Sequence, residues 1–237
     1  MASPLLPIPT GWSRVNLAAD AEQGFISRVD SGGTPSTTEE TYWEGDIPWL
    51  TPKEVTRMGD AVYVAETERM ITDLGLRNSA AKLLPPETVL LTKRAPVGAV
   101  AINAVEMTTN QGFLNFQCGP QLRPLYLAYW FRINRDYLEQ VANGSTYPEL
   151  YVSDLFEFIA GIPPLEEQDA ILSWIRAVRF LAHLGIPLEQ SAASTSEMVR
   201  FQEQTRRIRD LGRTLSEALF AGEIRVADSA PPLAALG

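Results

Sequence analysis

The sequence predicts a mixed α/β or α+β domain followed by a long antiparallel helical hairpin. Most glycines and prolines lie in the first 165 of the 237 residues, where turn signals separate short apolar runs such as Ile47–Leu50, Thr88–Thr92 and Val97–Ile102. Runs of this length between glycine, proline and asparagine are typical of strands. Beyond Leu165 the apolar residues recur at steps of three and four, which is typical of helices.

One helix is expected inside the first domain and two after it. Residues 125–141 carry an apolar and aromatic helical period, and a further helix begins after Pro163 and Pro164 and ends near Gly185. The last covers residues 188–220, about 50 Å at 1.5 Å per residue. This length favours a spacer or interaction arm over a hairpin that only caps the domain. The apolar side chains expected at its interfaces are Trp174, Ile175, Val178, Met198, Phe201, Ile208 and Leu215.

The chain therefore divides into a domain at residues 1–161, a helical region at 162–226 and a tail at 227–237 that is expected to be disordered. A single cysteine, Cys118, allows no internal disulfide and no cysteine-based zinc site. No apolar run reaches the roughly 20 residues that cross a bilayer. Residues 1–10 lack the basic and apolar segments of a signal peptide. We expect a cytoplasmic protein without a membrane partner.

The charge balance argues against tight binding of nucleic acid by this chain alone. The formal net charge is −9, and the first 164 residues carry 12 basic and 19 acidic side chains. Neutralisation of phosphates by lysine and arginine supplies most of the affinity in such complexes. Any contact with DNA must therefore come from a local patch, or a partner must supply much of the affinity.

The motifs of several enzyme classes are missing. The sequence contains neither GxGxxG nor GxxxxGK[ST], the glycine-rich turns that hold nucleotides. No Pro-Pro pair lies in the Asn/Asp-Pro-Pro-aromatic loop of amino-methyltransferases, and no lysine follows an acid at the spacing of carboxylate-dependent nucleases. His183 is the only histidine and has no neighbouring cysteine, serine or second histidine, so we interpret it as an ordinary helix residue. We expect no catalytic residue, no metal site and no cofactor in this chain.

Four local patterns remain. The first runs from residue 31 to residue 53, where Gly32 and Gly33 permit an unusual backbone turn. Around them Thr34, Thr51 and Lys53 supply short donors and a cation, which suit contacts with phosphates and base edges.

The second pattern is the adjacent pair Lys93 and Arg94 at a strand end, which is either a phosphate clamp or a solvated strand end. The third holds Asn110 and Gln111, whose amides can bond adenine in the major groove or satisfy backbone groups in a turn. The fourth is a polar loop at residues 143–148, followed by the Pro-Pro start of the first C-terminal helix.

Together these patterns resemble the target-recognition domain of specificity subunits in type I restriction–modification systems. The matching elements occur in the family's order along residues 6–226: Gly-Gly-Thr-Pro-Ser, Tyr-Trp-x-Gly-Asp-Ile-Pro-Trp, residues 71–79, Thr-Asn-Gln-Gly-Phe, Gly-Ser-Thr, Pro-Pro-Leu-x-Glu-Gln and residues 219–225. Each fragment alone is weak, and the ordered set is specific. The residues expected near DNA are Thr34, Thr51, Lys53, Lys93, Arg94, Asn110, Gln111, Ser145 and Thr146.

The resemblance implies a non-catalytic subunit that recognises double-stranded DNA. Separate modification subunits would bind S-adenosylmethionine and methylate adenine, and a restriction subunit could add translocation and cleavage. The helices of such subunits space two recognition domains and dock the modification subunits.

Two features depart from the family pattern. This chain has one recognition domain and one helical region where family chains normally have two of each, so it would pair with itself or with another half. A homodimer would read a two-fold symmetric, interrupted site. Ala95 replaces a frequent glycine in the Lys-Arg loop. The alternatives are a protein-binding adaptor or anti-restriction decoy, and a methyltransferase fragment, which the missing cofactor motif disfavours.

Overall fold

The computed structural model describes residues 8–17, 24–94, 96–142, 149–157 and 159–184, with the single positions Thr214 and Ala218. The chain forms two compact units. The first contains the chain from Arg14 to Ile162, and the second contains residues 8–13 and the helix that follows Pro163.

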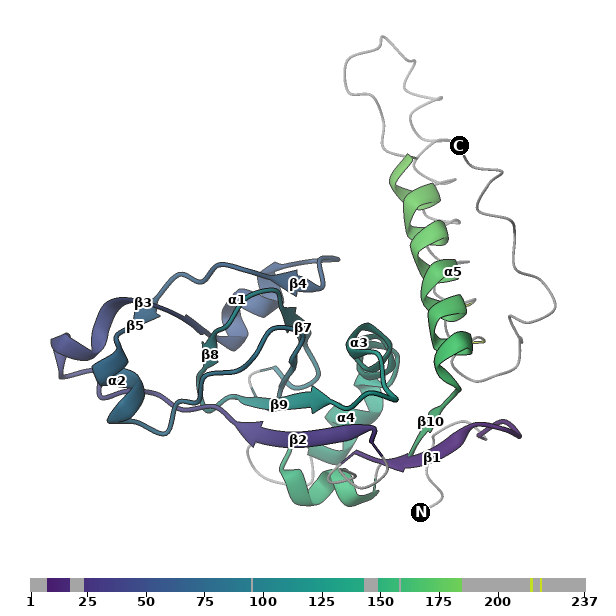
Figure 1. Ribbon diagram of the computed structural model, residues 1–237, viewed down its shortest axis with the longest axis horizontal. Helices are drawn as coiled ribbons and strands as arrows, with labels where there is room; N and C mark the ends of the chain where they lie inside the picture. Colours follow the sequence, from purple (N-terminus) through teal and green to yellow (C-terminus); the bar gives the residue numbers. More distant parts are fainter. Residues whose placement is uncertain are drawn as a thin grey trace, which may run out of the picture. The chain divides into compact units, whose positions relative to one another are not determined.

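A five-stranded sheet forms the centre of the first unit (Figure 1). Its strands in spatial order are β2 (Ile26–Ser31), β9 (Phe113–Cys118), β6 (Val89–Thr92), β7 (Val100–Asn103) and β4 (Tyr63–Val64). Neighbouring strands are antiparallel, except that β4 runs parallel to β7. All residues of β6 and β7 are buried, as in a sheet that is covered on both faces. The strands predicted at 88–92 and 97–102 are thus confirmed as β6 and β7, the second of which starts three residues later than expected.

The two faces of this sheet carry different partners, because successive side chains of a strand point to opposite faces. On one face α3 (Pro124–Ile133) packs against β6 and β7, and Phe131 lies with its ring centroid 5.0 Å from that of Phe116. On the other face Leu90 and Phe113 join a buried cluster with Val55 of α1 (Pro52–Arg57). Helix α1 is thereby fixed next to the strand ends that carry the candidate site.

A smaller three-stranded sheet extends the first unit at the α2 end (Figure 1). It contains β5 (Met70–Ile71), β3 (Trp43–Leu50) and β8 (Thr108–Thr109), with η1 (Glu40–Tyr42) and α2 (Asp73–Arg77) beside β3. Strand β3 is antiparallel to β5 and parallel to β8. Trp43 and Trp49 meet edge to face with ring centroids 5.1 Å apart, and they form the core of this sheet with Ile71 and Ala81.

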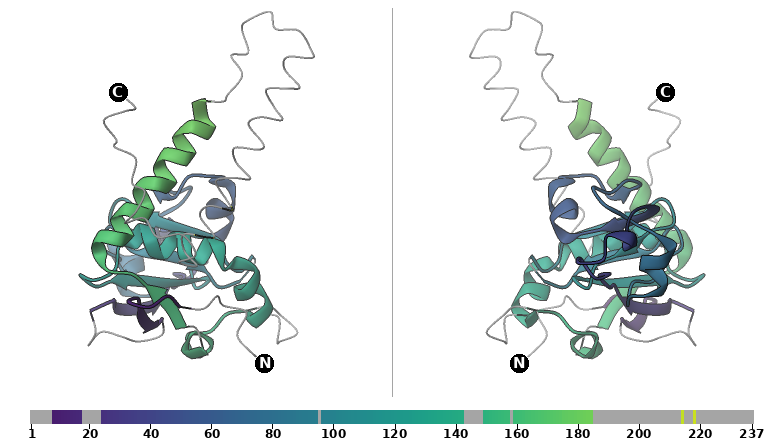
Figure 2. Two further views of the ribbon diagram at one scale, coloured as in Figure 1. Left: turned by 90° about the vertical axis from the view of Figure 1, so that its right-hand side faces the viewer. Right: turned by 90° about the vertical axis from the view of Figure 1, so that its left-hand side faces the viewer.

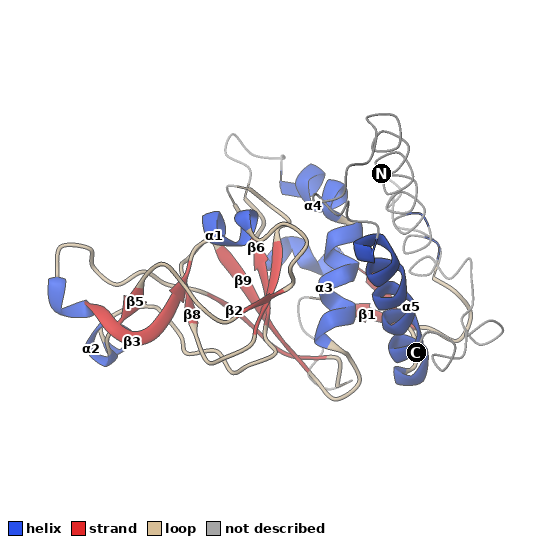
Figure 3. Ribbon diagram, turned by 90° about the horizontal axis from the view of Figure 1, so that it is seen from above, coloured by secondary structure: helices blue, strands red, loops and turns tan. Residues whose placement is uncertain are grey.

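The prediction of a single helix at residues 125–141 is wrong, because the helix is interrupted at Asn134. Helix α3 ends at Ile133, and α4 (Arg135–Ala142) starts in another direction (Figure 3). The backbone N–H and the side-chain Nδ2 of Asn134 both donate to the carbonyl of Trp130, at 3.1 and 2.8 Å. This side chain competes locally with the helical ladder, which the apolar period on either side does not reveal.

Strands β1 (Ser13–Asn16) and β10 (Ile159–Ile162) pair as a separate two-stranded sheet, purple beside green in both views of Figure 2. A 3-10 helix, η2 (Val152–Glu157), precedes β10.

The helix predicted after the Pro-Pro pair is present as α5 (Leu165–Leu184) in the second unit. In its first turn the buried side chain of Gln168 donates to the carbonyl of Pro163 at 2.9 Å. On the following turns Ile175 is buried and Trp174 is half-buried. The side chain of Val178 lies outside the described residues, as do four further residues of the predicted interface set: Met198, Phe201, Ile208 and Leu215. Within the described part of the chain, no helix combines the length and the apolar character needed to span a bilayer.

Candidate nucleic-acid interface

Three loops, which follow β2, β6 and β8, converge in the first unit with the start of α1, which follows β3. We call them the loop cluster, which consists of residues 32–36, 51–53, 93–94 and 110–112. Backbone hydrogen bonds join them: Gly33 N–H donates to Thr109 O at 2.9 Å, Asn110 N–H to Leu50 O at 3.0 Å, and Lys93 N–H to Gly112 O at 2.8 Å. Seven of the nine residues expected near DNA therefore lie in one connected surface.

Two glycines allow these loops to approach one another. A Cβ added at Gly32 would lie closer than 3.0 Å to the backbone oxygen of Asn110. A Cβ at Gly112 would lie 2.9 Å from the side chain of Pro52. The requirement at Gly32 is one of space and not of backbone angle, since its φ is not positive. The Gly-Gly sequence thus places the loop after β2 directly against the turn after β8.

Asn110 and Gln111 take different roles of the two that the sequence left open, which were stabilising a turn and contacting a base. The Oδ1 atom of Asn110 accepts from Gly112 N–H at 2.8 Å, which is the turn-stabilising role. Gln111 is exposed, and its Oε1 accepts from the hydroxyl of Thr34. Its Nε2 group has no acceptor among the described residues. Thr34 thus orients an exposed amide whose donor end remains available.

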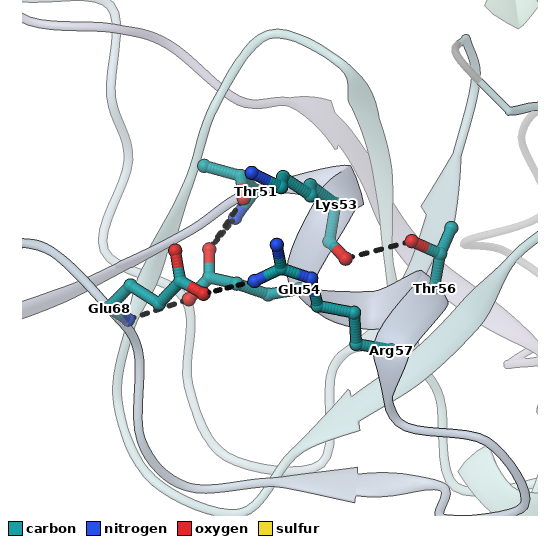
Figure 4. Close-up of polar contacts among 6 residues, drawn as sticks. All are labelled: Thr51, Lys53, Glu54, Thr56, Arg57 and Glu68. Carbon is teal, nitrogen blue, oxygen red and sulfur yellow. Dashed lines mark hydrogen bonds and ion pairs between the residues drawn. The ribbon is translucent and has the colours of Figure 1, made fainter.

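The segment at residues 51–53 starts helix α1 (Figure 4). The carboxylate of Glu54 accepts from the backbone N–H and the hydroxyl of Thr51, at 2.8 and 2.6 Å, and its other oxygen accepts from Glu68 N–H at 2.7 Å. The hydroxyl proton of Thr51 therefore serves the helix start. Lys53 is exposed, and its ammonium forms no ion pair within the described part of the chain. In Figure 4 only its backbone carbonyl takes part in an interaction, with Thr56.

The cations of the second pattern share an acid that lies 55 residues beyond them in sequence. Lys93 Nζ lies 3.0 Å from Glu149, and Arg94 lies 3.6 Å from the same carboxylate. Their side chains are 13% and 41% exposed, and the carbonyl of Lys93 accepts from Leu150 N–H. Lys93 is therefore neither a solvated strand end nor a free cation. The phosphate clamp at Lys93 and Arg94 stays a prediction. With Glu149 counted, the net charge of the group is +1 instead of +2.

The protonation of this group follows from its pairing. Burial alone would raise the pKa of Glu149, but the hydrogen bond from Lys93 and the charges of Lys93 and Arg94 outweigh it and lower the pKa. The charge of Glu149 in turn raises the pKa of the Tyr151 hydroxyl. Glu149 is thus ionised at neutral pH and holds both cations in place.

One cation at the edge of the loop cluster escaped the sequence analysis. The guanidinium of Arg69 lies 3.5 Å from the ring centroid of Trp43 and 5.5 Å from that of Trp49. The even spacing of the two tryptophans in one strand signals a shared face. No local pattern signals Arg69, which comes from the loop before β5.

Ser145 and Thr146 lie outside the described residues, so their expected contact with DNA remains a prediction. Among the described residues no cluster of three His, Cys, Asp or Glu side chains could hold a metal ion. What the loop cluster offers is hydrogen bonding and positive charge: an oriented amide, an unpaired lysine and a stacked arginine.

Comparisons with known proteins identify the family of this chain. Residues 22–179 match the family model described as "Type I restriction modification DNA specificity domain". The chain is 41% identical over 148 residues to the type I restriction enzyme MjaIX specificity subunit of Methanocaldococcus jannaschii, which covers 62% of this chain and 34% of that one. It is 26% identical over 156 residues to the EcoR124I/EcoR124II specificity subunit of Escherichia coli, covering 63% and 38%. The chain thus spans only about a third of the length of these relatives.

Solved structures show the same mixed α+β fold. The HsdS subunit from Thermoanaerobacter tengcongensis superimposes with a TM-score of 0.58 at 19% identity, covering 93% of this chain and 47% of that chain. A chain from a structure of a type I R-M system gives the same TM-score at 21% identity, covering 93% and 48%. With a family model matched over more than half of its residues, the chain belongs to the family of type I restriction–modification DNA specificity domains.

Proposed function

We propose that this chain recognises a short sequence in double-stranded DNA and directs a partner adenine methyltransferase to it, and that it catalyses no reaction itself. Family membership supports the recognition role, since the relatives at 41% and 26% identity are named specificity subunits. The sequence contains neither GxGxxG nor GxxxxGK[ST], which supports the proposal that the partner binds S-adenosylmethionine.

The observation that carries the proposal is the convergence of the loop cluster. Gln111 presents an amide oriented by Thr34, and such an amide can bond bidentately to adenine in the major groove. Lys53 in the first turn of α1 and Arg94 after β6 are suited to backbone phosphates, and their segments are both joined to the turn at residues 110–112. A surface with both groups on connected loops can combine base reading with positioning.

The chain's charge explains why a partner is needed. The chain has a net charge of −9, and within its described part, where Lys93 is paired with Glu149, few unpaired cations are available to release counterions from DNA. Modification subunits that clamp the backbone would supply this part of the affinity. We therefore expect the isolated chain to bind DNA weakly and to lose that binding readily as salt rises.

The proposed assembly uses the helical region beyond Pro163. Its helices would dock the modification subunits and, where the system has one, a restriction subunit. The recognition domain would work as one of a pair, and a homodimer would read a bipartite site with two-fold symmetry. Trp174 and Ile175 on α5 are the described residues of the predicted interface set.

Methylation mapping tests this proposal. The chain is coexpressed with its methyltransferase partner in a host without adenine methylation, and modified adenines are located by sequencing. We expect one interrupted motif that is methylated only when both proteins are present. Methylation without a shared motif, or co-purification of the partner with no methylation, would favour the adaptor or decoy interpretation instead.

A matched pair of variants connects the result to the loop cluster. Gln111→Ala removes the oriented amide, and Gln140→Ala removes an exposed amide on α4. A lost bidentate contact of about 1–3 kcal/mol lowers methylation of the motif roughly 5- to 150-fold in competition. Gln140→Ala should methylate as the wild type does. Equal behaviour of the two variants would remove Gln111 from the reading surface.

A further inference from the structure

Arg69 is held differently from the other basic residues around the small sheet. Its guanidinium carbon lies over the Trp43 ring, 3.5 Å from the ring centroid, and the side chain is exposed. Among the described residues it forms no ion pair. Arg57, by contrast, is paired with Glu68 at 2.5 Å, and Lys82 is paired with Asp30 at 2.6 Å. Arg69 is thus a positive charge that an aromatic face positions and that no acid in the described part of the chain neutralises.

The backbone of Arg69 is also anchored. Its carbonyl accepts from Trp49 N–H at 3.1 Å and from the Thr67 hydroxyl at 2.7 Å. Thr67 Oγ1 in turn lies 3.2 Å from Trp49 N. The loop before β5 is therefore fixed to β3 directly at this residue, and the position of the guanidinium is fixed at both ends of the side chain.

The same two tryptophans support the loop that carries Thr34. The indole N–H of Trp49 donates to Gly33 O at 2.9 Å, and that of Trp43 donates to Ser36 O at 3.0 Å. Arg69 lies on the face of Trp43, while the loop lies at its N–H edge. The guanidinium and the oriented amide system of the loop cluster thus share one rigid support.

Stacking on an indole leaves the chemistry of the guanidinium available. The cation–π contact uses the flat face, whereas the N–H donors point outward in the plane of the group. Such a fork binds two neighbouring acceptors at once, and duplex DNA offers this pair as O6 and N7 of guanine or as two oxygens of a phosphate. Prior fixation reduces the side-chain entropy lost on binding.

We propose that Arg69 is a further DNA-contacting residue of this chain, which binds a paired acceptor of the duplex next to the loop cluster. This inference rests on the proposed function. It extends the reading surface from the loop cluster across the Trp43 face of the small sheet.

The test compares three variants of the full chain in complex with its methyltransferase partner. Arg69→Gln removes the charge, and Arg69→Lys keeps the charge but removes the planar fork. Arg77→Gln is the matched control, because Arg77 is an exposed arginine of the same sheet region, on α2. Binding to the mapped site and to its single-base variants is measured by fluorescence anisotropy at several salt concentrations, well below the melting temperature of each variant.

The two sources of the acceptor pair give different results. If Arg69 binds guanine, Arg69→Gln and Arg69→Lys both lose roughly 5- to 150-fold in affinity, and discrimination disappears at one base pair only. If it binds a phosphate, Arg69→Gln weakens binding to all duplexes equally and reduces the salt slope by about 1, while Arg69→Lys retains that slope. Either result supports the inference, provided that Arg77→Gln binds as the wild type does.

Three outcomes overturn the inference, and they can be told apart. If the wild type discriminates its site and Arg69→Gln matches it in affinity, base preference and salt slope, only the role of Arg69 is wrong. If Arg77→Gln loses as much DNA affinity as Arg69→Gln, the loss reflects the overall charge of the chain and not a contact made by Arg69. If the wild-type complex shows no preference among duplexes, the proposed function itself fails, and the role of Arg69 with it.

Discussion

Substitution of Gly32 by alanine tests whether the loops of the cluster depend on close backbone approach. The added Cβ would lie closer than 3.0 Å to Asn110 O, Thr109 Oγ1 and Thr109 O, two of which are backbone atoms that no rotamer change can move. The loop after β2 would have to shift, which breaks the adjacent bond from Gly33 to Thr109. Overpacking costs about 2–3 kcal/mol and the lost hydrogen bond about 1 kcal/mol, so we expect a loss of about 3–4 kcal/mol.

Thermal unfolding followed by tryptophan fluorescence measures this loss. In a chain of this size each kcal/mol lowers the melting temperature by about 2–4 °C, which predicts a fall of at least roughly 6 °C for Gly32→Ala. Gly59→Ala is the control, because no atom lies within 4 Å of its added Cβ and only its φ of +58° opposes alanine. We expect that control to cost about 1 kcal/mol. A Gly32→Ala protein no less stable than Gly59→Ala would refute the close approach.

Three further predictions concern charge and backbone strain. Because the pKa of Glu149 is lowered in the folded protein, its stabilising contribution is complete above its ordinary value of 4.5 and is lost as the pH falls through the folded pKa; the melting temperature of Glu149→Gln should fall less in acid than that of the wild type, and parallel curves would contradict the pairing. Glu44 has a φ of +61° in the bulge of β3, so Glu44→Gly should raise stability by about 0.5–1 kcal/mol in urea unfolding, whereas a loss would show that no strain is relieved. Lys53→Gln should lower the logarithmic salt slope of DNA binding by about 0.9 for all sequences alike, and an unchanged slope would remove Lys53 from the phosphate contacts.

The sequence predicted those features whose cause is local. The buried run at β6 can be read from neighbouring residues. The backbone turn predicted at Gly32 and Gly33 uses no positive φ, and Gly32 is required by the close approach of Thr109 and Asn110, which lie far away in the sequence. Helix α5 follows from its period and from the prolines that precede it. The ordered motifs also singled out residues 34, 51, 53 and 110–111, and backbone hydrogen bonds bring their segments together.

The features that sequence reasoning missed depend on distant partners or on a local competitor. Glu149 neutralises Lys93 across 56 positions, and Arg69 reaches Trp43 only because β5 pairs with β3. Asn134 ends α3 through its own side chain, although the apolar period continues on both sides. Charge pairing in particular changes a site's chemistry without leaving any mark in the spacing of residues.

Cross-linking to a target duplex tests the central claim, that the loop cluster is the surface of this chain that reads DNA. The complex with the methyltransferase partner is irradiated on a duplex that carries photoreactive bases throughout the mapped site, and the cross-linked peptides are identified by mass spectrometry. The account predicts cross-links within the loop cluster, at residues 32–36, 51–53, 93–94 and 110–112, that disappear on a duplex without the site. Cross-links confined to α3 and α4, with none in the loop cluster, would contradict it.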